Sequence, residues 1–232
     1  MVTERDRSVV GWVAVIGAVS AQDVMARFGL GRTVGYRRLR ALVDQGLLSR
    51  ARLVHGQPTL YVATREGIAW AGIPHLDPAR VGVATTRHWA VCARLAVILE
   101  REHGGAEVWG EPRLRAAELH ASRPIASAEL GRLPDGRPRL RRPDLVLFPP
   151  DPALPVAVEV ELSVKAARRL EAICRAWARC RLVSEVRYYA PPHVGRAVSR
   201  AVSVVRAHDV IRVVALDDAV NPKEADRVRF AA

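Results

Sequence analysis

Apolar residues in the first part of the chain recur every three or four positions, which is the spacing of helices that bury one face. Gly29 and Gly46 follow two of these segments, as glycines commonly do at helix ends. Two apolar runs of strand length come next, separated by the turn-forming residues 55–58. We predict helices at 7–19, 21–28, 33–45 and 66–71, and strands at 47–53 and 59–63. The pattern therefore predicts three helices, a hairpin and a further short helix.

The predicted helix at 33–45 has an apolar stripe on one side and a basic face on the other. The stripe, expected to face the core, consists of Tyr36, Leu39, Leu42 and Val43. The face left for solvent carries a hydroxyl and three guanidinium groups, those of Thr33, Arg37, Arg38 and Arg40. Arginines presented in this way on the second helix of a helix-turn-helix read base edges in the major groove. A solvated basic face is the alternative for such a helix taken alone.

The surrounding residues favour DNA reading. Arg50 and Arg52 stand in the predicted hairpin, and the stretch 38–48 (Arg-Leu-Arg-Ala-Leu-Val-Asp-Gln-Gly-Leu-Leu) resembles bacterial winged-helix DNA-binding proteins. The element order is also that of a winged helix-turn-helix, although some such domains bind proteins instead. We predict a winged helix-turn-helix DNA-binding domain at residues 1–73 and a proline-containing linker at 74–84.

Patterns in the second half alternate between helical and strand spacing. We predict helices at 85–103, 165–181 and 194–207, and strands at 106–111, 142–148, 156–162, 185–189 and 210–216. This order predicts a mixed sheet flanked by helices, and therefore an α/β domain at 85–217 in a chain that is α+β overall. Residues 218–232 are predicted to be a polar tail.

The segment 112–142 is the least regular part of this half. It holds eight arginines against three acidic residues, and a turn between Leu130 and Leu140 would allow a hairpin. Its arginines, Arg139 and Arg141 among them, are candidates for contacts with DNA phosphates. A surface insertion without a partner is an equally good interpretation.

Composition supports a polyanionic partner. The chain has 36 basic and 24 acidic residues, for a formal net charge of +12, and only two of the basic residues are lysines. A GC-rich genome would explain the choice of arginine over lysine, but it would not explain the net charge. Double-stranded DNA is therefore the expected partner. A homodimer is left open.

Other features of composition favour a cytoplasmic, nucleoid-associated protein. No apolar run reaches membrane-spanning length, so no membrane partner is expected. The run 9–21 imitates the core of a signal peptide, but Glu4 and Asp6 precede it and it continues into the predicted helix-turn-helix. The three cysteines lie in apolar helical patterns without zinc-type spacing.

Three acidic residues stand out in the second half. Asp144 begins an apolar run, while Glu159 and Glu161 lie two positions apart in the next run and so share one face of a strand. Carboxylates on a central strand are costly to bury unless a cation meets them. An arginine and a divalent metal are the two candidates.

At these residues the chain resembles the PD-(D/E)xK nuclease-like superfamily, and most of all the plasmid replication-relaxation family, which joins a winged helix to such a core. The resemblance implies that Asp144 and Glu159 are ligands of Mg²⁺ or Mn²⁺ in a catalytic site. The position of the family's lysine is taken by Glu161, which departs from the superfamily pattern. Lys165 or Arg169 would then supply the missing cation.

Two functions follow from this resemblance. In the first, the protein binds duplex DNA on a plasmid or other mobile element, and the nuclease-like domain is a regulator or scaffold. In the second, it is a magnesium-dependent enzyme that nicks or cuts DNA through Asp144, Glu159, Glu161 and Lys165. For either, we expect the three acids to line one basic-rimmed pocket, with Asp144 and Glu159 within metal-binding distance of each other.

Overall fold

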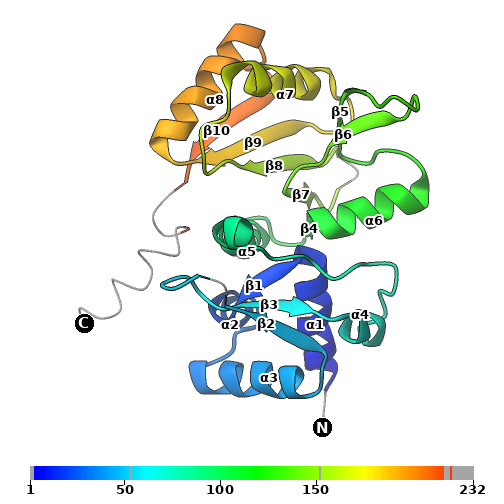
Figure 1. Ribbon diagram of the computed structural model, residues 1–232, viewed down its shortest axis with the longest axis vertical. Helices are drawn as coiled ribbons and strands as arrows, with labels where there is room; N and C mark the ends of the chain where they lie inside the picture. Colours follow the sequence, from blue (N-terminus) through cyan, green and yellow to red (C-terminus); the bar gives the residue numbers. More distant parts are fainter. Residues whose placement is uncertain (1–2, 53, 152, 217–219, 221–232) are drawn as a thin grey trace. The chain divides into compact units, whose positions relative to one another are not determined.

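The computed structural model describes residues 3–52, 54–151, 153–216 and 220, and it divides into two compact units between Glu102 and His103. Both helices and strands are present in each unit (Figure 1). The predicted polar tail at 218–232 lies outside the described residues except for Val220. Within the described part of the chain, no helix is long and apolar enough to cross a membrane.

The first unit contains a helix-turn-helix followed by a hairpin. Its elements are α1 (Glu4–Ile16), β1 (Ala18–Ser20), α2 (Ala21–Phe28), α3 (Arg32–Asp44), β2 (Leu48–Ala51), β3 (Leu60–Ala63), α4 (Arg65–Trp70), the 3₁₀ turn η1 (Val83–Thr85) and α5 (Thr86–Glu102). The strands form an antiparallel sheet in the order β1-β3-β2. This is the predicted winged-helix order, with one strand added.

Strand β1 falls where the sequence pattern predicts the end of a helix. Gly17 ends α1 with a φ of 108°, a conformation that side chains disfavour, and the chain then turns into the strand. Ser20 and Asp23 form a capping box that starts α2 directly afterwards. A three-residue strand between two caps is too short to produce a recognisable alternation.

Helix α5 belongs to the first unit, which corrects the predicted boundary. It packs on β1, and its Arg94 Nε lies 2.9 Å from Oδ1 of buried Asp23. Leu76 is buried, and apolar residues of the segment 74–84 pack against Ala18 and other core residues of this unit. Apolar packing therefore holds the predicted linker and α5 in the first unit, because proline content alone does not stop a segment from docking.

The second unit is built on a mixed five-stranded sheet, which confirms the predicted α/β class. Its elements are β4 (Glu107–Gly110), α6 (Glu111–Ala121), β5 (Ala128–Arg132), β6 (Pro138–Arg141), β7 (Leu145–Phe148), β8 (Val156–Val160), α7 (Ala167–Arg179), β9 (Glu185–Ala190), α8 (Pro192–Val205) and β10 (Ile211–Ala215). The strand order is β10-β9-β8-β7-β4, with β8, β9 and β10 parallel and the other pairs antiparallel.

Helices α7 and α8 pack against each other and on one face of this sheet (Figure 1). Trp177 and Cys174 of α7 are fully buried there, with Val198 of α8. Ala157 and Glu159 of β8 alternate with Val158 and share this side of the strand. The sheet pattern thus places one carboxylate beneath α7.

The predicted irregular segment 112–142 is more ordered than its sequence suggests. Helix α6 occupies its first part, where proline near the helix start and few apolar residues concealed the helix. The remainder forms the β5–β6 hairpin, which the predicted turn between Leu130 and Leu140 anticipated. A bulge between Glu129 and Gly131, where Gly131 has a φ of 145°, bends this hairpin.

Candidate functional site

Helix α3 presents three arginines, Arg32, Arg37 and Arg40, to solvent. Arg40 has a long ion-pair contact of 3.9 Å with exposed Asp44 and no other ion pair among the described residues. Thr33 is also exposed, near the start of the helix. Their side chains are therefore available to a partner.

The sequence pattern places Tyr36 in the core stripe, but in the structure this residue is 40% exposed. The buried position is instead Gly35, where an added Cβ would lie 2.4 Å from Cγ of Met25 on α2. Helix α2 therefore approaches α3 closely at Gly35, and the buried face of α3 consists of Gly35, Leu39 and Leu42. Tyr36 joins the exposed face, with the guanidinium of Arg32 5.9 Å from its ring centroid.

Arg38 has a structural role and does not fit the predicted DNA-reading role. Its Nη1 donates to Oδ1 of Asp6 at 2.7 Å and to Oγ1 of Thr3 at 3.3 Å. Burial disfavours the charged form of Asp6, but hydrogen bonds from Arg38 and Thr3 outweigh it and lower the pKa of Asp6. Arg38 thereby ties α3 to the first turn of α1.

The hairpin adds arginines next to α3. Arg50 lies on β2 opposite Tyr61 of β3, and Arg52 follows the end of β2; both arginines are exposed. Because α3 packs against β2, these residues lie on adjoining elements. The first unit therefore has an exposed basic surface, which we call the α3–β2 surface and define as Arg32, Arg37, Arg40, Arg50 and Arg52.

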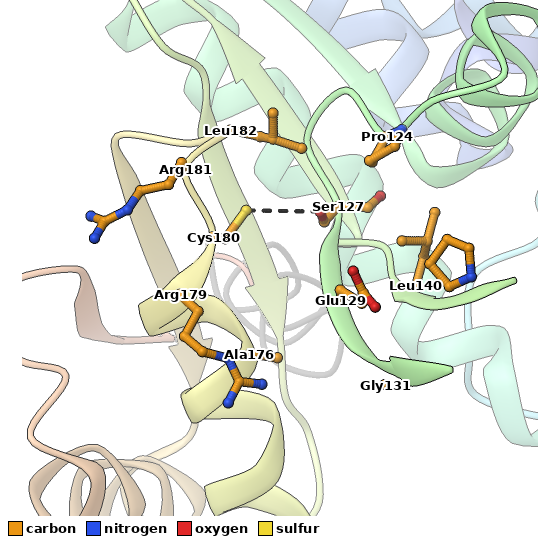
Figure 2. Close-up of a pocket in the computed structure, with 11 residues that line it drawn as sticks. Pro124, Ser127, Glu129, Gly131, Leu140, Ala176, Arg179, Cys180, Arg181 and Leu182 are labelled. Atoms are coloured by element: carbon orange, nitrogen blue, oxygen red, sulfur yellow. Dashed lines mark hydrogen bonds between the residues drawn. The ribbon is translucent and has the colours of Figure 1, made fainter. Parts of the chain in front are cut away.

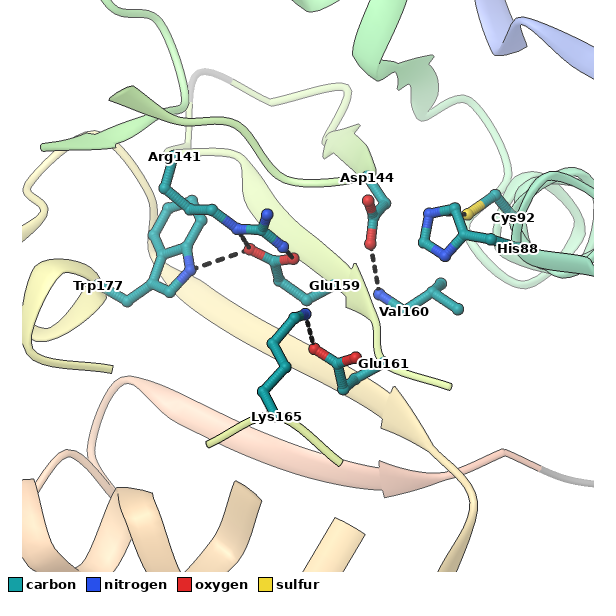
Figure 3. Close-up of polar contacts among 9 residues, drawn as sticks. All are labelled: His88, Cys92, Arg141, Asp144, Glu159, Val160, Glu161, Lys165 and Trp177. Atoms are coloured by element: carbon teal, nitrogen blue, oxygen red, sulfur yellow. Dashed lines mark hydrogen bonds and ion pairs between the residues drawn. The ribbon is translucent and has the colours of Figure 1, made fainter. Parts of the chain in front are cut away.

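The acids of the second unit meet cations of the protein itself (Figure 3). Glu159, only 1% of whose side chain is exposed, accepts hydrogen bonds from Arg141 on both of its oxygens. The Nε of Arg141 lies 2.9 Å from Oε1, and Trp177 Nε1 donates to the same oxygen at 3.1 Å. A bidentate guanidinium is the strongest partner that a protein offers a carboxylate.

Asp144 and Glu161 are engaged in the same region. Oδ2 of Asp144 accepts the backbone N–H of Val160 at 2.7 Å, and the charge of Asp144 acts on both Glu159 and Arg141. Glu161 forms an ion pair with Lys165. The prediction that Lys165 neutralises one of these acids is thus confirmed for Glu161.

These contacts test whether the acidic cluster fits a divalent metal. Three N–H donors already meet the Glu159 carboxylate, and an ammonium group meets Glu161. A guanidinium therefore stands where a cation would bind Glu159, and the arrangement does not fit Mg²⁺ or Mn²⁺. This geometry does not support Glu159 as a metal ligand. The metal-binding role of Asp144 and the catalytic roles of Asp144, Glu161 and Lys165 stay predictions.

Arg141 also departs from its predicted DNA-binding role, because it is paired and only 25% of its side chain is exposed. Its neighbour Arg142 donates to Glu118 of α6 at 2.8 Å, and the same carboxylate accepts the backbone N–H of Ile125 at 3.0 Å. Two adjacent arginines thus anchor the end of β6 to two buried glutamates. Arg139 remains exposed, and its contact with DNA stays a prediction.

Burial raises the pKa of Glu159 to about 7, even though Arg141 favours the charged carboxylate. The folded protein then binds more protons than the unfolded chain between the ordinary carboxyl pKa and pH 7. The contribution of Glu159 to the free energy of unfolding is therefore fully present below the unfolded pKa and falls as pH rises toward 7, by at most about 1.4 kcal/mol per pH unit.

Comparing the free energy of unfolding of the wild type and Glu159→Gln from pH 4 to 8 measures this contribution. We expect the free energy of unfolding of the wild type, relative to that of Glu159→Gln, to fall as pH rises from the ordinary carboxyl pKa to 7. A constant difference would show that Glu159 has the same pKa in both states.

Comparisons with known proteins do not assign a family. No protein-family model matches the chain, and no curated protein matches it. A solved structure, protein VC1899 from Vibrio cholerae, aligns with all of this chain and with 58% of its own chain, at 10% identity and a TM-score of 0.35. The chain thus spans less than two thirds of that protein, and a likeness this weak carries no functional information.

Proposed function

We propose that the protein binds double-stranded DNA through α3 and the β2–β3 hairpin, and that the second unit is a non-catalytic regulator or scaffold. The observation that carries this proposal is the difference between the paired arginine and the exposed arginines of α3. Arg38 is used internally, whereas Arg37 and Arg40 extend to solvent from the outer face of the second helix of a helix-turn-helix. That helix inserts into the major groove in such motifs.

The hairpin supports the same interface. Arg50 and Arg52 are exposed beside α3, where they can contact phosphates while the helix reads bases. The net charge of +12 favours a polyanion over a protein partner of ordinary charge. Under this proposal the protein acts at the nucleoid in the cytoplasm, and its resemblance to replication-relaxation proteins suggests a plasmid or other mobile element.

The non-catalytic role of the second unit rests on the Arg141–Glu159 pair. The two acids that the nuclease resemblance would assign to a metal are Asp144 and Glu159, and the second is held by a guanidinium and an indole N–H. We expect no nicking of supercoiled plasmid in Mg²⁺ or Mn²⁺. Nicking that Asp144→Asn abolishes would establish the enzyme and refute this part of the proposal.

Salt dependence of duplex binding tests the interface. A preferred duplex is first selected from a random pool. Each phosphate contact to such a duplex contributes about 0.9 to the slope of log K against log salt concentration. Arg50→Ala and Arg52→Ala should each lower the slope by about one unit with little change in sequence preference. Fluorescence anisotropy at several salt concentrations measures both quantities.

Arg65→Ala is the matched control for charge. Arg65 is an exposed arginine of the same unit, but it lies on α4 and pairs with Asp77 at 3.1 Å. Its replacement should leave the slope unchanged. Equal effects of all three substitutions, or no duplex binding by the wild type at low salt, would refute the proposed interface.

A further inference from the structure

The second unit contains a cavity of about 480 Å³ between the β5–β6 hairpin and the C-terminal end of α7 (Figure 2). This volume lies within the range of small-molecule sites. Glu129, Gly131 and Leu140 line it from the hairpin, and Arg179 and Leu182 line it from α7 and the residues that follow. The bulge at Gly131 bends the hairpin at this wall. The cavity is separate from the pairs made by Arg141 and Arg142, whose side chains do not line it.

A buried hydroxyl in the cavity wall lacks a hydrogen-bond partner. Ser127 is 2% exposed and lines the cavity, and its Oγ has no partner among the described residues. Its backbone oxygen is engaged instead, accepting the Sγ–H of Cys180 at 3.7 Å. A buried polar group without a partner costs free energy. The Oγ is covered in this conformation, so a change of side-chain rotamer is what would bring this donor to a ligand oxygen in the cavity.

The cavity also has charge of both signs and apolar walls. Arg179 and Arg181 are exposed, and neither has a carboxylate partner among the residues that the structure describes. Glu129 stands on the opposite wall, and its one ion pair within the described part of the chain is a long contact of 3.9 Å with Arg132. Leu140 and Leu182 supply apolar surface to the lining.

We infer that this cavity binds a nucleoside phosphate whose base carries an exocyclic amino group. Arginine is the preferred donor to phosphate oxygens, which places the phosphate near Arg179, with Ser127 as a second donor. The apolar walls fit the faces of a base, and a carboxylate such as Glu129 accepts from the N4 amino group of cytosine. This site is additional to the proposed duplex interface and does not depend on it.

Calorimetric titration of the full chain with dCMP, dTMP and deoxycytidine tests the inference. We expect dCMP to bind with a dissociation constant of about 1 mM or below. Binding of dTMP should be about tenfold weaker, because its O4 cannot donate to Glu129. Deoxycytidine should bind about tenfold more weakly or not at all, because it lacks the phosphate.

Three variants locate the bound nucleotide. Arg179→Gln should weaken dCMP binding about tenfold. Ser127→Ala should weaken it about fivefold without loss of thermal stability, because no residue that the structure describes hydrogen-bonds the Ser127 hydroxyl. Arg175→Gln is the matched control, since Arg175 lies one turn earlier on α7 and pairs with Glu171 at 3.0 Å. The control should change binding less than twofold.

A tetranucleotide, d(pC)₄, distinguishes a free nucleotide from a nucleotide unit of single-stranded DNA. Tighter binding of d(pC)₄ than of dCMP assigns the site to a strand, and equal binding assigns it to the free nucleotide; either result supports the site. Absence of binding of both probes at millimolar concentration would overturn the inference, as would equal weakening by Arg179→Gln and Arg175→Gln. The double variant Arg37→Ala/Arg40→Ala should retain dCMP binding even if duplex binding fails.

Discussion

Replacing Arg141 by Ala is expected to lower the free energy of unfolding by about 3–5 kcal/mol. The substitution leaves the fully buried carboxylate of Glu159 with the indole N–H of Trp177 as its remaining side-chain donor among the described residues. Without Arg141 the buried group must either stay charged without compensation or bind a proton, and both cost free energy at about pH 8, above the pKa of Glu159 in the wild type. Denaturant unfolding of the full chain, combined with hydrogen exchange of amides in β7 and β8, measures the effect in the second unit.

Arg139→Ala is the matched control, because Arg139 lies two residues earlier on the same strand and is exposed. We expect it to change stability by no more than about 0.5 kcal/mol. The double substitution Arg141→Leu/Glu159→Leu should recover most of the loss, because buried ion pairs are often replaceable by apolar residues. A small effect of Arg141→Ala would show that Glu159 is neutral or hydrated and that the pair is not a structural anchor.

Removal of the exposed arginines of α3 is expected to have the largest effect on DNA binding. Arg37→Ala and Arg40→Ala should each weaken binding to the preferred duplex by about 1–3 kcal/mol, because each would lose its contacts with base edges. Binding to a scrambled duplex should weaken less, so that the ratio of the two affinities falls. Fluorescence anisotropy with both duplexes measures this ratio.

Two further variants separate base reading from charge and from folding. Arg37→Lys keeps the charge but loses the planar two-donor geometry, so it should reduce sequence preference while preserving most affinity for the scrambled duplex. Arg38→Ala should lower the thermal midpoint, because it breaks the link between α3 and Asp6 of α1. Unchanged specificity after loss of both Arg37 and Arg40 would remove α3 as the reading element.

Much of the local structure follows from sequence because its causes are local. Hydrophobic spacing and capping residues predicted α2 at its observed bounds and α3 within one residue at each end. The parts that failed depend on distant contacts. Strand β1 exists because it pairs with β3, forty or more residues later in the chain. Helix α5 joins the first unit because it packs against β1.

The acidic cluster also has features that follow from local sequence and features that depend on distant contacts. Periodicity predicted that Glu159 would lie on a buried strand and would need a cation, and both expectations hold in the structure. Periodicity could not decide whether the cation that meets Glu159 is an arginine or a metal, because this depends on where the end of β6 lies relative to β8. Adjacent residues of a strand face opposite sides, so Arg141 and Arg142 at the end of β6 point to opposite sides. This pair of arginines was the available signal in the sequence for an arginine partner.

The sequence by itself determined the order of the elements other than β1, η1 and α6, the mixed α/β class of the second unit and the basic character of α3 and the hairpin, because spacing, caps and charge are properties of short segments. Only the tertiary structure decided which arginines are free for a partner. Arg38 and Arg141 are held by buried carboxylates from distant parts of the chain, whereas Arg37, Arg40 and Arg139 remain exposed. Burial of a charge demands a partner, and only the fold specifies which side chain supplies it.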